Sequence, residues 1–430
     1  MYFLYSLLLG LAVVVSAPWW LTRMLTQGKY RAGLGERLGR VPSRLGTAEA
    51  CIWVHAVSVG EVLAISGLVA GLRERFPERR LVVSTTTATG QKLARERFGG
   101  NDVFYYPLDF GFAIRPYLRA LQPSLIVLAE SEFWPNFVRL ARRAGARIAV
   151  VNARASDRSL PRYLRLRSLW RRVLGNLDLF LAQSDEDARR LVAIGAPPAQ
   201  VIVTGNLKFD VQPPELLPAV DMLRRILRPA TAVVVCGSTA EGEEPIILQA
   251  FAALLQRHPQ AALILAPRRP ERFSAVAEMV AASGLKSWRR SQLAGSESIS
   301  GGVVLLDSIG ELASIYSLAS VAFVGGSLVP RGGHNILEPA QHGVATLVGP
   351  HTGNFRDIIG IFERAGAVNI VEPHDFAGKL LRLLDDPSAR EQLGRRAAEV
   401  VRQQRGATER TLDALTKLVT PQPQPEHAAT

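Results

Sequence analysis

The sequence predicts an α/β protein made of two successive domains, each built on a parallel sheet. From residue 51 onward, short apolar runs rich in β-branched residues alternate with helix-length segments. This alternation is typical of parallel strands that are covered by helices on both faces. A proline-rich stretch at 211–230 interrupts the pattern, which then starts again. Because 430 residues suffice for two domains of ordinary size, we expect two Rossmann-like domains that face each other across a cleft.

The first 22 residues carry no charged side chain and predict a membrane-anchor helix. Such a helix is about 30 Å long, close to the thickness of a bilayer core. Trp19 and Trp20 lie where an interfacial aromatic belt is found, and the arginine-rich residues that follow favour a cytoplasmic position for the rest of the chain. A signal peptide cut near Ala17 and a buried core helix are the two alternatives.

Residues 23–50 are predicted to form a basic juxtamembrane connector, followed by an N-terminal domain over 51–210. The clearest helix of this domain, 60–76, ends before Pro77, because the residue before a proline disfavours the helical conformation. Strands of this domain are expected at 51–57, 81–87, 103–108, 124–130, 147–153, 179–183 and 201–205.

The proline-rich stretch 211–230 is predicted to be a linker, followed by a second domain over 231–418. Its C-terminal segment, 372–418, is expected to be helical, and the tail 419–430 has the composition of a disordered segment. Strands of this domain are expected at 231–238, 261–269, 302–308, 321–327 and 345–350.

The composition favours an anionic partner other than nucleic acid. The net charge is +13, and such a charge attracts anionic lipids or phosphorylated molecules; the alternative is that it only maintains solubility. Neither zinc-finger spacing nor an RNA-binding aromatic motif occurs in the sequence. The two cysteines, Cys51 and Cys236, each lie in an apolar strand-like run, so we expect neither a disulfide nor a zinc site.

The loop after the first strand carries the best candidate for a catalytic base. Gly60 permits a tight turn from strand to helix, and Glu61 falls in the first helical turn, close to Ser58. A carboxylate in this position could accept a proton from an attacking hydroxyl. The alternative is that Glu61 only complements the helix dipole.

Two further acidic residues, Glu130 and Glu132, follow the apolar strand at 124–130. Carboxylates at the end of a buried strand are costly unless they are paired or used in function. The alternative is that these acids or Ser131 cap the next helix.

Three loops of the second domain, each at the end of a strand, are candidates for an anion site. Backbone amides at the start of a helix bind phosphate, and arginine strengthens the interaction, although turns also need glycine. The loops are Gly237-Ser238-Thr239, Pro267-Arg268-Arg269-Pro270, and Gly325-Gly326-Ser327 with the following Arg331-Gly332-Gly333-His334-Asn335.

Three other features leave two interpretations open. The acidic triplet 185–187 suggests a metal site, but the preceding Ser184 indicates a helix-capping box. Lys208 either points into the cleft or is an ordinary surface lysine. The segment 154–172 has seven arginines among aromatic and aliphatic residues, which suits either an anionic lipid surface or a solvated basic helix.

Taken in order, these motifs resemble the 3-deoxy-D-manno-octulosonic acid (Kdo) transferases of lipopolysaccharide biosynthesis. The resemblance extends from the anchor to about residue 400, with Asn206 where the family commonly has serine. The motifs that carry it are WVHAVSVGE, AESEFWPN, VVNARAS, VTGNLKFD, PRRPERF and GGHNILEPA.

The resemblance implies a GT-B glycosyltransferase of the inner membrane that needs neither a metal ion nor a cofactor. Its donor is CMP-Kdo, its acceptor is a lipid A precursor (lipid IVA), and Glu61 is the general base. The resemblance places Ser58, Gly60, Glu130, Glu132, Asn152 and Arg154 on the acceptor side, and Lys208, Gly237, Ser238, Arg268, Gly332, Gly333, His334, Asn335 and Glu338 on the donor side.

Two rival functions remain at this level. Another membrane-associated GT-B enzyme that uses a UDP-sugar would bind UDP rather than CMP. A non-catalytic basic tether would bind anionic partners with a steep salt dependence and transfer no sugar.

Overall fold

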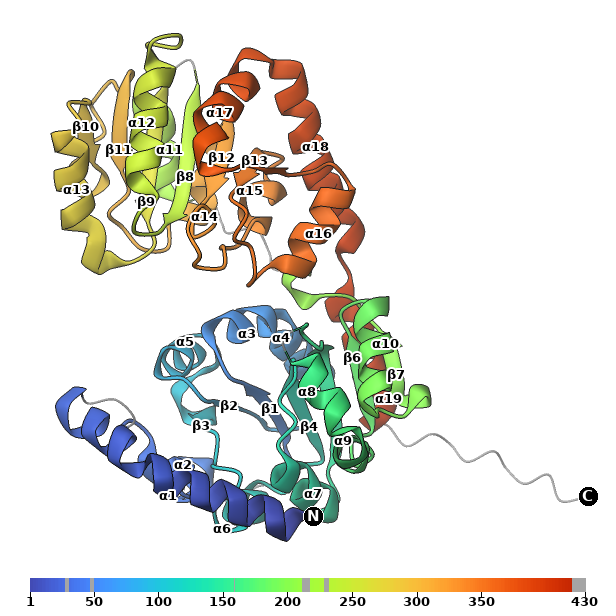
Figure 1. Ribbon diagram of the computed structural model, residues 1–430. Helices are drawn as coiled ribbons and strands as arrows, with labels where there is room; N and C mark the ends of the chain where they lie inside the picture. The colour runs from blue at the N-terminus through green and yellow to red at the C-terminus, as the bar shows by residue number, and fades with distance from the viewer. Residues whose placement is uncertain (28–30, 47–49, 158, 211–216, 228–231, 420–430) are drawn as a thin grey trace, which may run out of the picture. The chain divides into compact units, whose positions relative to one another are not determined.

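The computed structural model describes residues 1–27, 31–46, 50–157, 159–210, 217–227 and 232–419. The chain divides into two compact units, which are coloured by residue number in Figure 1. Unit 1 comprises the described residues of Met1–Val211 and Gln404–Thr430, and unit 2 comprises those of Gln212–Gln403. The predicted tail 419–430 lies outside the described residues, apart from Val419.

Unit 1 contains a seven-stranded parallel sheet in the order β3-β2-β1-β4-β5-β6-β7. All seven strands predicted for the N-terminal domain are confirmed. The strands are β1 (Ile52–Ala56), β2 (Leu81–Thr85), β3 (Val103–Tyr105), β4 (Leu125–Ala129), β5 (Arg147–Ala153), β6 (Leu179–Ala182) and β7 (Val201–Val203).

The helices of unit 1 follow local sequence signals. Ser58, Thr87 and Ser184 each cap a helix with the side-chain oxygen. The predicted helix 60–76 is two helices, which meet at Ile65. The helices are α1 (Tyr2–Gln27), α2 (Leu34–Arg37), α3 (Val59–Ala64), α4 (Ser66–Arg75), α5 (Ala88–Phe98), α6 (Gly111–Leu121), α7 (Pro135–Arg143), α8 (Leu160–Arg165), α9 (Arg167–Leu174), α10 (Asp185–Ile194) and α19 (Ala407–Val419).

The sheet of unit 1 is buried on both faces because successive side chains of a strand point to opposite sides. In β1, Trp53 belongs to one hydrophobic cluster, whereas Ile52, Val54 and Ala56 belong to the cluster on the other face. Trp53 is fully buried and lies edge-on to Phe137, with ring centroids 5.0 Å apart. This arrangement explains why the strands are apolar throughout rather than alternating with polar residues.

The predicted connector is part of the folded unit, so that boundary is corrected. Helix α1 continues past residue 22 to Gln27, and α2 follows within the same stretch. In α2, Glu36 accepts a hydrogen bond from the backbone N–H of Tyr105 at 2.7 Å. Leu45 is fully buried in the core of unit 1.

The last helix, α19, also lies in unit 1, whereas the sequence assigned it to the second domain. Leu412 and Leu415 are buried in the cluster that covers one face of the unit 1 sheet. A Cβ at Gly71 of α4 would lie 2.4 Å from Leu412 Cδ1, so this glycine permits the close approach of the two helices. Asp210 accepts hydrogen bonds from the backbone N–H groups of Gly406 and Thr408, where α19 begins.

Unit 2 contains a second seven-stranded parallel sheet, in the order β10-β11-β9-β8-β12-β13-β14. The five predicted strands are confirmed, and two short edge strands, β10 and β14, were not predicted. The strands are β8 (Val233–Thr239), β9 (Ala262–Pro267), β10 (Ser287–Arg289), β11 (Gly302–Leu305), β12 (Val321–Val324), β13 (Ala345–Val348) and β14 (Asn369–Ile370).

Helices cover both faces of this sheet as well (Figure 1). The predicted linker 211–230 is wrong in part: α11 lies inside it and buries Val220 and Leu223 against the sheet, while 211–216 and 228–231 lie outside the described residues. The helices are α11 (Pro218–Ile226), α12 (Glu244–Leu255), α13 (Phe273–Ala282), α14 (Leu312–Ile315), α15 (Leu337–Gln341), α16 (Arg356–Arg364), α17 (Phe376–Asp385) and α18 (Pro387–Gln404).

Candidate active site

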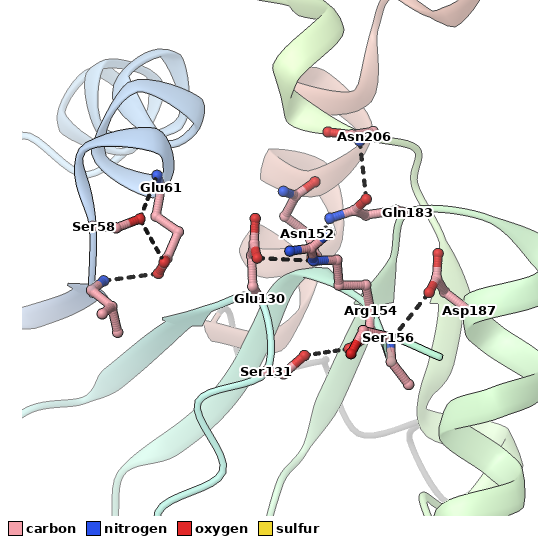
Figure 2. Close-up of polar contacts among 12 residues, drawn as sticks. Ser58, Glu61, Glu130, Ser131, Asn152, Arg154, Ser156, Gln183, Asp187 and Asn206 are labelled. Carbon is pink, nitrogen blue, oxygen red and sulfur yellow. Dashed lines mark hydrogen bonds and ion pairs between the residues drawn. The ribbon is translucent and has the colours of Figure 1, made fainter. Parts of the chain in front are cut away.

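The strand order of unit 1 reverses between β1 and β4, and ligands of open α/β sheets bind at the carboxyl ends of strands beside such a switch point. Glu61 follows β1 and Glu130 follows β4, so both acids lie at this switch point. Figure 2 shows the two side chains at the ends of their strands, with Asn152 and Arg154 beside Glu130. The structure therefore brings together acidic residues that are 69 positions apart in the sequence.

Glu61 is held by the turn in which it lies. Its Oε2 accepts a hydrogen bond from the backbone N–H of Val57 at 2.8 Å, and its Oε1 accepts one from the Ser58 hydroxyl at 2.9 Å. In return, Ser58 Oγ accepts a hydrogen bond from the Glu61 N–H at 3.4 Å. These reciprocal bonds fix the Glu61 carboxylate at the first turn of α3, a position that is compatible with the alternative interpretation, in which Glu61 complements the helix dipole.

The pKa of Glu61 also fits a role in acid–base chemistry. Burial raises the pKa of Glu61 to about 7, against the hydrogen bonds from Val57 and Ser58; the negative charges of Glu130 and Glu132 raise it further. A carboxyl group with a pKa near the working pH is well suited to take and return protons. Structural support for the helix and acid–base chemistry are therefore compatible at this residue.

Glu130 lies between two cations. Its Oε2 is 2.9 Å from Arg154 Nε, and its Oε1 is 3.3 Å from Lys208 Nζ. The backbone of Glu130 is also strained: its φ of 58° is a left-handed conformation, which costs energy for a residue other than glycine. The ion pair with Glu130 also decides between the two interpretations of Lys208. Lys208 is therefore not an ordinary surface lysine: although it was predicted on the donor side, it lies in unit 1 and pairs with Glu130.

A network of amide side chains positions the segment that carries Lys208. Asn152 Oδ1 accepts a hydrogen bond from the Leu207 N–H at 3.0 Å, and Gln183 Nε2 donates to the Asn152 carbonyl at 2.9 Å. Asn206 Nδ2 donates to Gln183 Oε1 at 3.0 Å. Asn206 thus has a clear structural task, because its side chain fixes Gln183. Asn152 also has a left-handed backbone, with φ of 52°, and its Nδ2 is buried without a partner in the described residues.

The second acid, Glu132, is hydrogen-bonded to Trp134 rather than paired with Arg154 or Lys208. Trp134 Nε1 donates a hydrogen bond to Glu132 Oε2 at 2.8 Å, and burial raises the pKa of this carboxyl despite that bond. Neither Glu130 nor Glu132 caps the following helix, so the capping alternative is wrong for these two residues. The structure therefore separates the two acids, and only Glu130 is paired with cations within the described residues.

The cap of α7 comes from Asp109, a residue that sequence reasoning missed. Its two carboxylate oxygens accept hydrogen bonds from the N–H groups of Asn136, at 3.1 Å, and Phe137, at 2.7 Å. Burial raises the pKa of Asp109 to about 6. Because Asp109 precedes α7 by more than 25 residues, no local capping pattern in the sequence could have revealed it.

The acidic triplet 185–187 is a capping box, as predicted. Ser184 Oγ accepts a hydrogen bond from the Asp187 N–H at 3.1 Å and donates to Asp187 Oδ2 at 2.7 Å. Within the described ranges, no group of three or more His, Cys, Asp or Glu side chains is arranged to hold a metal ion.

In unit 2 the strand order reverses between β8 and β12, and the glycine-bearing loops follow these two strands. Gly237, near the end of β8, is close to Tyr316: a Cβ there would lie 2.0 Å from the tyrosine hydroxyl. Ser238 has a left-handed backbone, with φ of 54°. This end of the sheet therefore carries close packing and backbone strain of the kind that gathers at functional sites.

The amides of the loop after β12 are occupied, which corrects one prediction. The fully buried Glu243 carboxylate accepts hydrogen bonds from the N–H groups of Gly326 (2.7 Å), Ser327 (2.9 Å) and Leu328 (2.9 Å). It also accepts one from Ala240 at 2.7 Å. Since a carboxylate already fills this ring of donors, the amides of Gly326 and Ser327 are not the phosphate site.

The remaining donor-side candidates of unit 2 influence one another electrostatically. Burial lowers the pKa of His334 to about 4, and the nearby Arg268 lowers it further. Burial also raises the pKa of Glu338, against the hydrogen bond from Asn335 Nδ2 at 3.3 Å and the charge of Arg268. Arg268, His334 and Glu338 therefore lie together, with a neutral imidazole and one cationic side chain.

The fold places the protein in a structural class. A putative UDP-N-acetylglucosamine 2-epimerase from Listeria monocytogenes is 16% identical, with a TM-score of 0.60, over 89% of this chain and 100% of that chain. A UDP-GlcNAc 2-epimerase from Neisseria meningitidis is 14% identical, with a TM-score of 0.58. These similarities, with two Rossmann-like units that carry polar residues at their switch points, define a protein of the GT-B fold.

Sequence relatives identify the family. The 3-deoxy-D-manno-octulosonic acid transferase of Haemophilus influenzae is 35% identical over 90% of this chain and 91% of the relative. The enzyme of the same name from Bordetella pertussis is 36% identical over 94% and 96%. A family model described as 3-deoxy-D-manno-octulosonic-acid transferase (kdotransferase) matches residues 32–211. The chain belongs to the Kdo transferase family and is a glycosyltransferase.

Proposed function

We propose that this protein transfers Kdo from CMP-Kdo to a lipid A precursor, lipid IVA, at the cytoplasmic face of the inner membrane. Family membership supports the sugar that is transferred. The observation that carries the chemical proposal is the position of Glu61 at the switch point of unit 1, with a pKa near 7. Figure 2 shows Ser58, Glu130, Asn152 and Arg154, four of the acceptor-side residues that accompany it.

In this proposal Glu61 is the general base. A sugar hydroxyl of the acceptor is a weak nucleophile until its proton begins to leave, and the Glu61 carboxylate accepts that proton. Because the pKa of Glu61 is raised to about 7, both its ionised and its protonated forms are populated near neutral pH. A direct displacement by this hydroxyl breaks the bond between Kdo and the CMP oxygen in one step, so the anomeric configuration is inverted.

Unit 1 is the proposed acceptor unit. Arg154 and Lys208 offer positive charge beside Glu130, which fits an acceptor that carries phosphate groups. Ser58 and Gly60 shape the turn that holds Glu61, and the unpaired buried Nδ2 of Asn152 is a donor available to a ligand. Glu132 is the further acceptor-side candidate of this loop.

Unit 2 is the proposed donor unit. Arg268 neutralises the phosphate of CMP-Kdo as the bond to the sugar breaks, since CMP leaves with one phosphate and charge stabilisation there needs no metal clamp. Asn335 and Glu338 contact the nucleotide, beside His334, and Gly332 and Gly333 allow the backbone to approach it. Gly237 and Ser238 line the same end of the sheet.

A transfer assay tests the proposal. Purified protein is incubated with CMP-Kdo and tetraacyl lipid IVA, and the acceptor is then weighed by mass spectrometry. We expect the mass to rise by one or more Kdo residues, and CMP but not UDP to inhibit the reaction. An unmodified acceptor with CMP-Kdo, together with transfer from a UDP-sugar, would show that the enzyme uses a different donor.

A further inference from the structure

The N-terminal turns of α1 are attached to unit 1 by side-chain contacts. Asn136 of α7 donates a hydrogen bond from Nδ2 to the Ser6 hydroxyl at 2.9 Å. The guanidinium of Arg139, also in α7, lies over the Tyr2 ring, 4.4 Å from its centroid. Tyr5 hydrogen-bonds to the Asp109 carboxylate, the group that caps α7. Three residues in the first two turns of α1 therefore contact polar or charged side chains of the folded unit.

A fourth contact comes from a different part of unit 1. Asn176, just after α9, places Nδ2 3.4 Å from the Tyr2 hydroxyl and also donates to the carbonyl of Arg172 at 2.7 Å. In Figure 1 the N-terminus of α1 lies beside α7, and the helix runs from there along one side of unit 1. The attachment therefore joins α1 to two separate segments of the same unit.

The two faces of α1 differ in exposure. One row of residues at helical spacing is partly buried: Tyr2, Tyr5, Leu9, Val13, Ala17, Trp20 and Met24. Large apolar side chains dominate the rest of the helix and are exposed, with Phe3 at 83%, Val14 at 69% and Val15 at 72%. The exposed apolar surface thus extends along the length of the helix and faces away from unit 1.

A membrane-crossing position of α1 conflicts with these contacts. If the helix spanned the bilayer with Arg23 at the cytoplasmic surface, Ser6 would lie about 26 Å deeper, at 1.5 Å per residue. The bilayer core is about 30 Å thick, so Asn136, Asp109 and Arg139 would have to enter hydrocarbon to reach α1. Burying charged groups of a folded unit in lipid is strongly unfavourable.

We propose that α1 lies in the plane of the bilayer surface, with both of its ends on the side of the membrane that carries unit 1. The exposed apolar surface enters the boundary between headgroups and acyl chains, while the contacts of Tyr2, Tyr5 and Ser6 hold the start of the helix on unit 1. In this position α1 is an interfacial anchor rather than a transmembrane one. The proposal concerns topology alone and does not depend on the proposed reaction.

Positive charge near α1 matches an anionic headgroup layer. Arg23 lies 4.2 Å from the ring centroid of Trp19, close to the C-terminal part of the helix. Arg171 and Arg172 are exposed in α9, next to the turn that contacts Tyr2. Leu164 and Leu166, in and just after the preceding helix α8, are 43% and 51% exposed. This mixture of arginine and leucine suits a surface that rests on anionic lipid.

Cysteine labelling in whole cells tests the topology. A cysteine inserted after Met1 is treated with a membrane-impermeant maleimide, in cells whose outer membrane alone is permeable. The native Cys51 and Cys236 are buried and serve as an unreactive background. We expect labelling only after the inner membrane is opened, as for the control Glu96→Cys on the surface of unit 1. Labelling of the N-terminal cysteine while the inner membrane is still intact would overturn the proposal.

Disulfide cross-linking in isolated membranes tests the contact itself, and it gives an answer even where lipid shields the N-terminal cysteine. The pair Ser6→Cys with Asn136→Cys is expected to form an intramolecular disulfide on mild oxidation. The control pair, Ser16→Cys with Asn136→Cys, should not, because residue 16 is about 15 Å further along the helix. No cross-link in the first pair, in protein that retains the compact fold of unit 1, would contradict an in-plane helix.

Discussion

At the scale of single residues, burial and the charge of Glu130 both raise the pKa of Glu61. Glu130 raises the pKa of Glu61 through its negative charge, while Arg154 and Lys208 pair with Glu130 itself. A base that must be ionised works only above its pKa, so activity should rise with pH through the pKa of Glu61. If Glu61 is the base, as proposed, its surroundings set the acid limb of the pH profile.

We predict that Glu130→Gln moves this acid limb to lower pH. The substitution removes a negative charge that raises the pKa of Glu61, so it favours the ionised carboxyl. The measurement is kcat/KM for Kdo transfer between pH 5 and 9, with the exposed Glu186→Gln as the control. An acid limb that stays in place or moves to higher pH would show that Glu61 is not the titrating base.

In unit 2, the buried Glu243 carboxylate fixes the loop after β12 by accepting four backbone hydrogen bonds. We predict that Glu243→Ala weakens CMP binding by at least tenfold, because four backbone N–H groups lose their acceptor and the loop after β12 loses its shape. Each buried donor left without an acceptor costs about 1–3 kcal/mol. Titration with CMP and hydrogen exchange of residues 326–328 measure the two effects, and Glu278→Ala, on the exposed side of α13, is the control. Unchanged exchange in this loop would contradict the assignment.

At the scale of elements, α19 completes the core of unit 1 although it comes from the far end of the chain. We predict that Leu412→Ala destabilises unit 1 by about 2–5 kcal/mol, the usual cost of truncating a buried leucine. Hydrogen exchange of the β1 and β4 amides reports this loss, while the β8 and β9 amides of unit 2 serve as an internal control. The exposed Lys417→Ala should leave both sets unchanged. Equal protection of β1 and β4 in Leu412→Ala would mean that α19 is not part of this core.

The elements also show which parts of the fold the sequence could reveal. Central strands such as β1 and β8 were found because strands buried on both faces read as continuous apolar runs. The edge strands β10 and β14 were missed because they have only three and two residues and leave little pattern. The assignment of α19 failed for another reason: its apolar face is equally compatible with either unit, and only the tertiary packing decides between them.

The sequence could identify the site residues that directly follow a strand, but not the long-range contacts between them. Glu61 and Glu130 could be identified because each follows a strand, and the structure places these strands side by side. The pairing of Glu130 with Lys208 bridges 78 positions and has no local sequence signal. Likewise, occupation of the glycine loop by Glu243 is a long-range contact, so the sequence could not distinguish an open anion site from one that is already filled.

At the scale of the whole molecule, each of the two units contributes a different group to the proposed reaction. Unit 1 supplies the Glu61 carboxyl group, whose pKa is raised to about 7, and unit 2 supplies Arg268 beside a neutral His334. The net charge of +13 favours a phosphorylated acceptor and donor as well as an anionic membrane. The family membership, the fold and the position of Glu61 all agree with Kdo transfer in lipopolysaccharide core biosynthesis.

The most direct test of the central claim is the activity of Glu61→Gln. We predict that this variant binds CMP-Kdo with the affinity of the wild type but loses transfer to lipid IVA by about 10²–10⁴-fold, the usual contribution of a positioned general base. Calorimetric titration gives the binding, and mass spectrometry of the acceptor gives the transfer. Normal turnover by Glu61→Gln would contradict the account, because a neutral amide cannot take the proton from the acceptor hydroxyl.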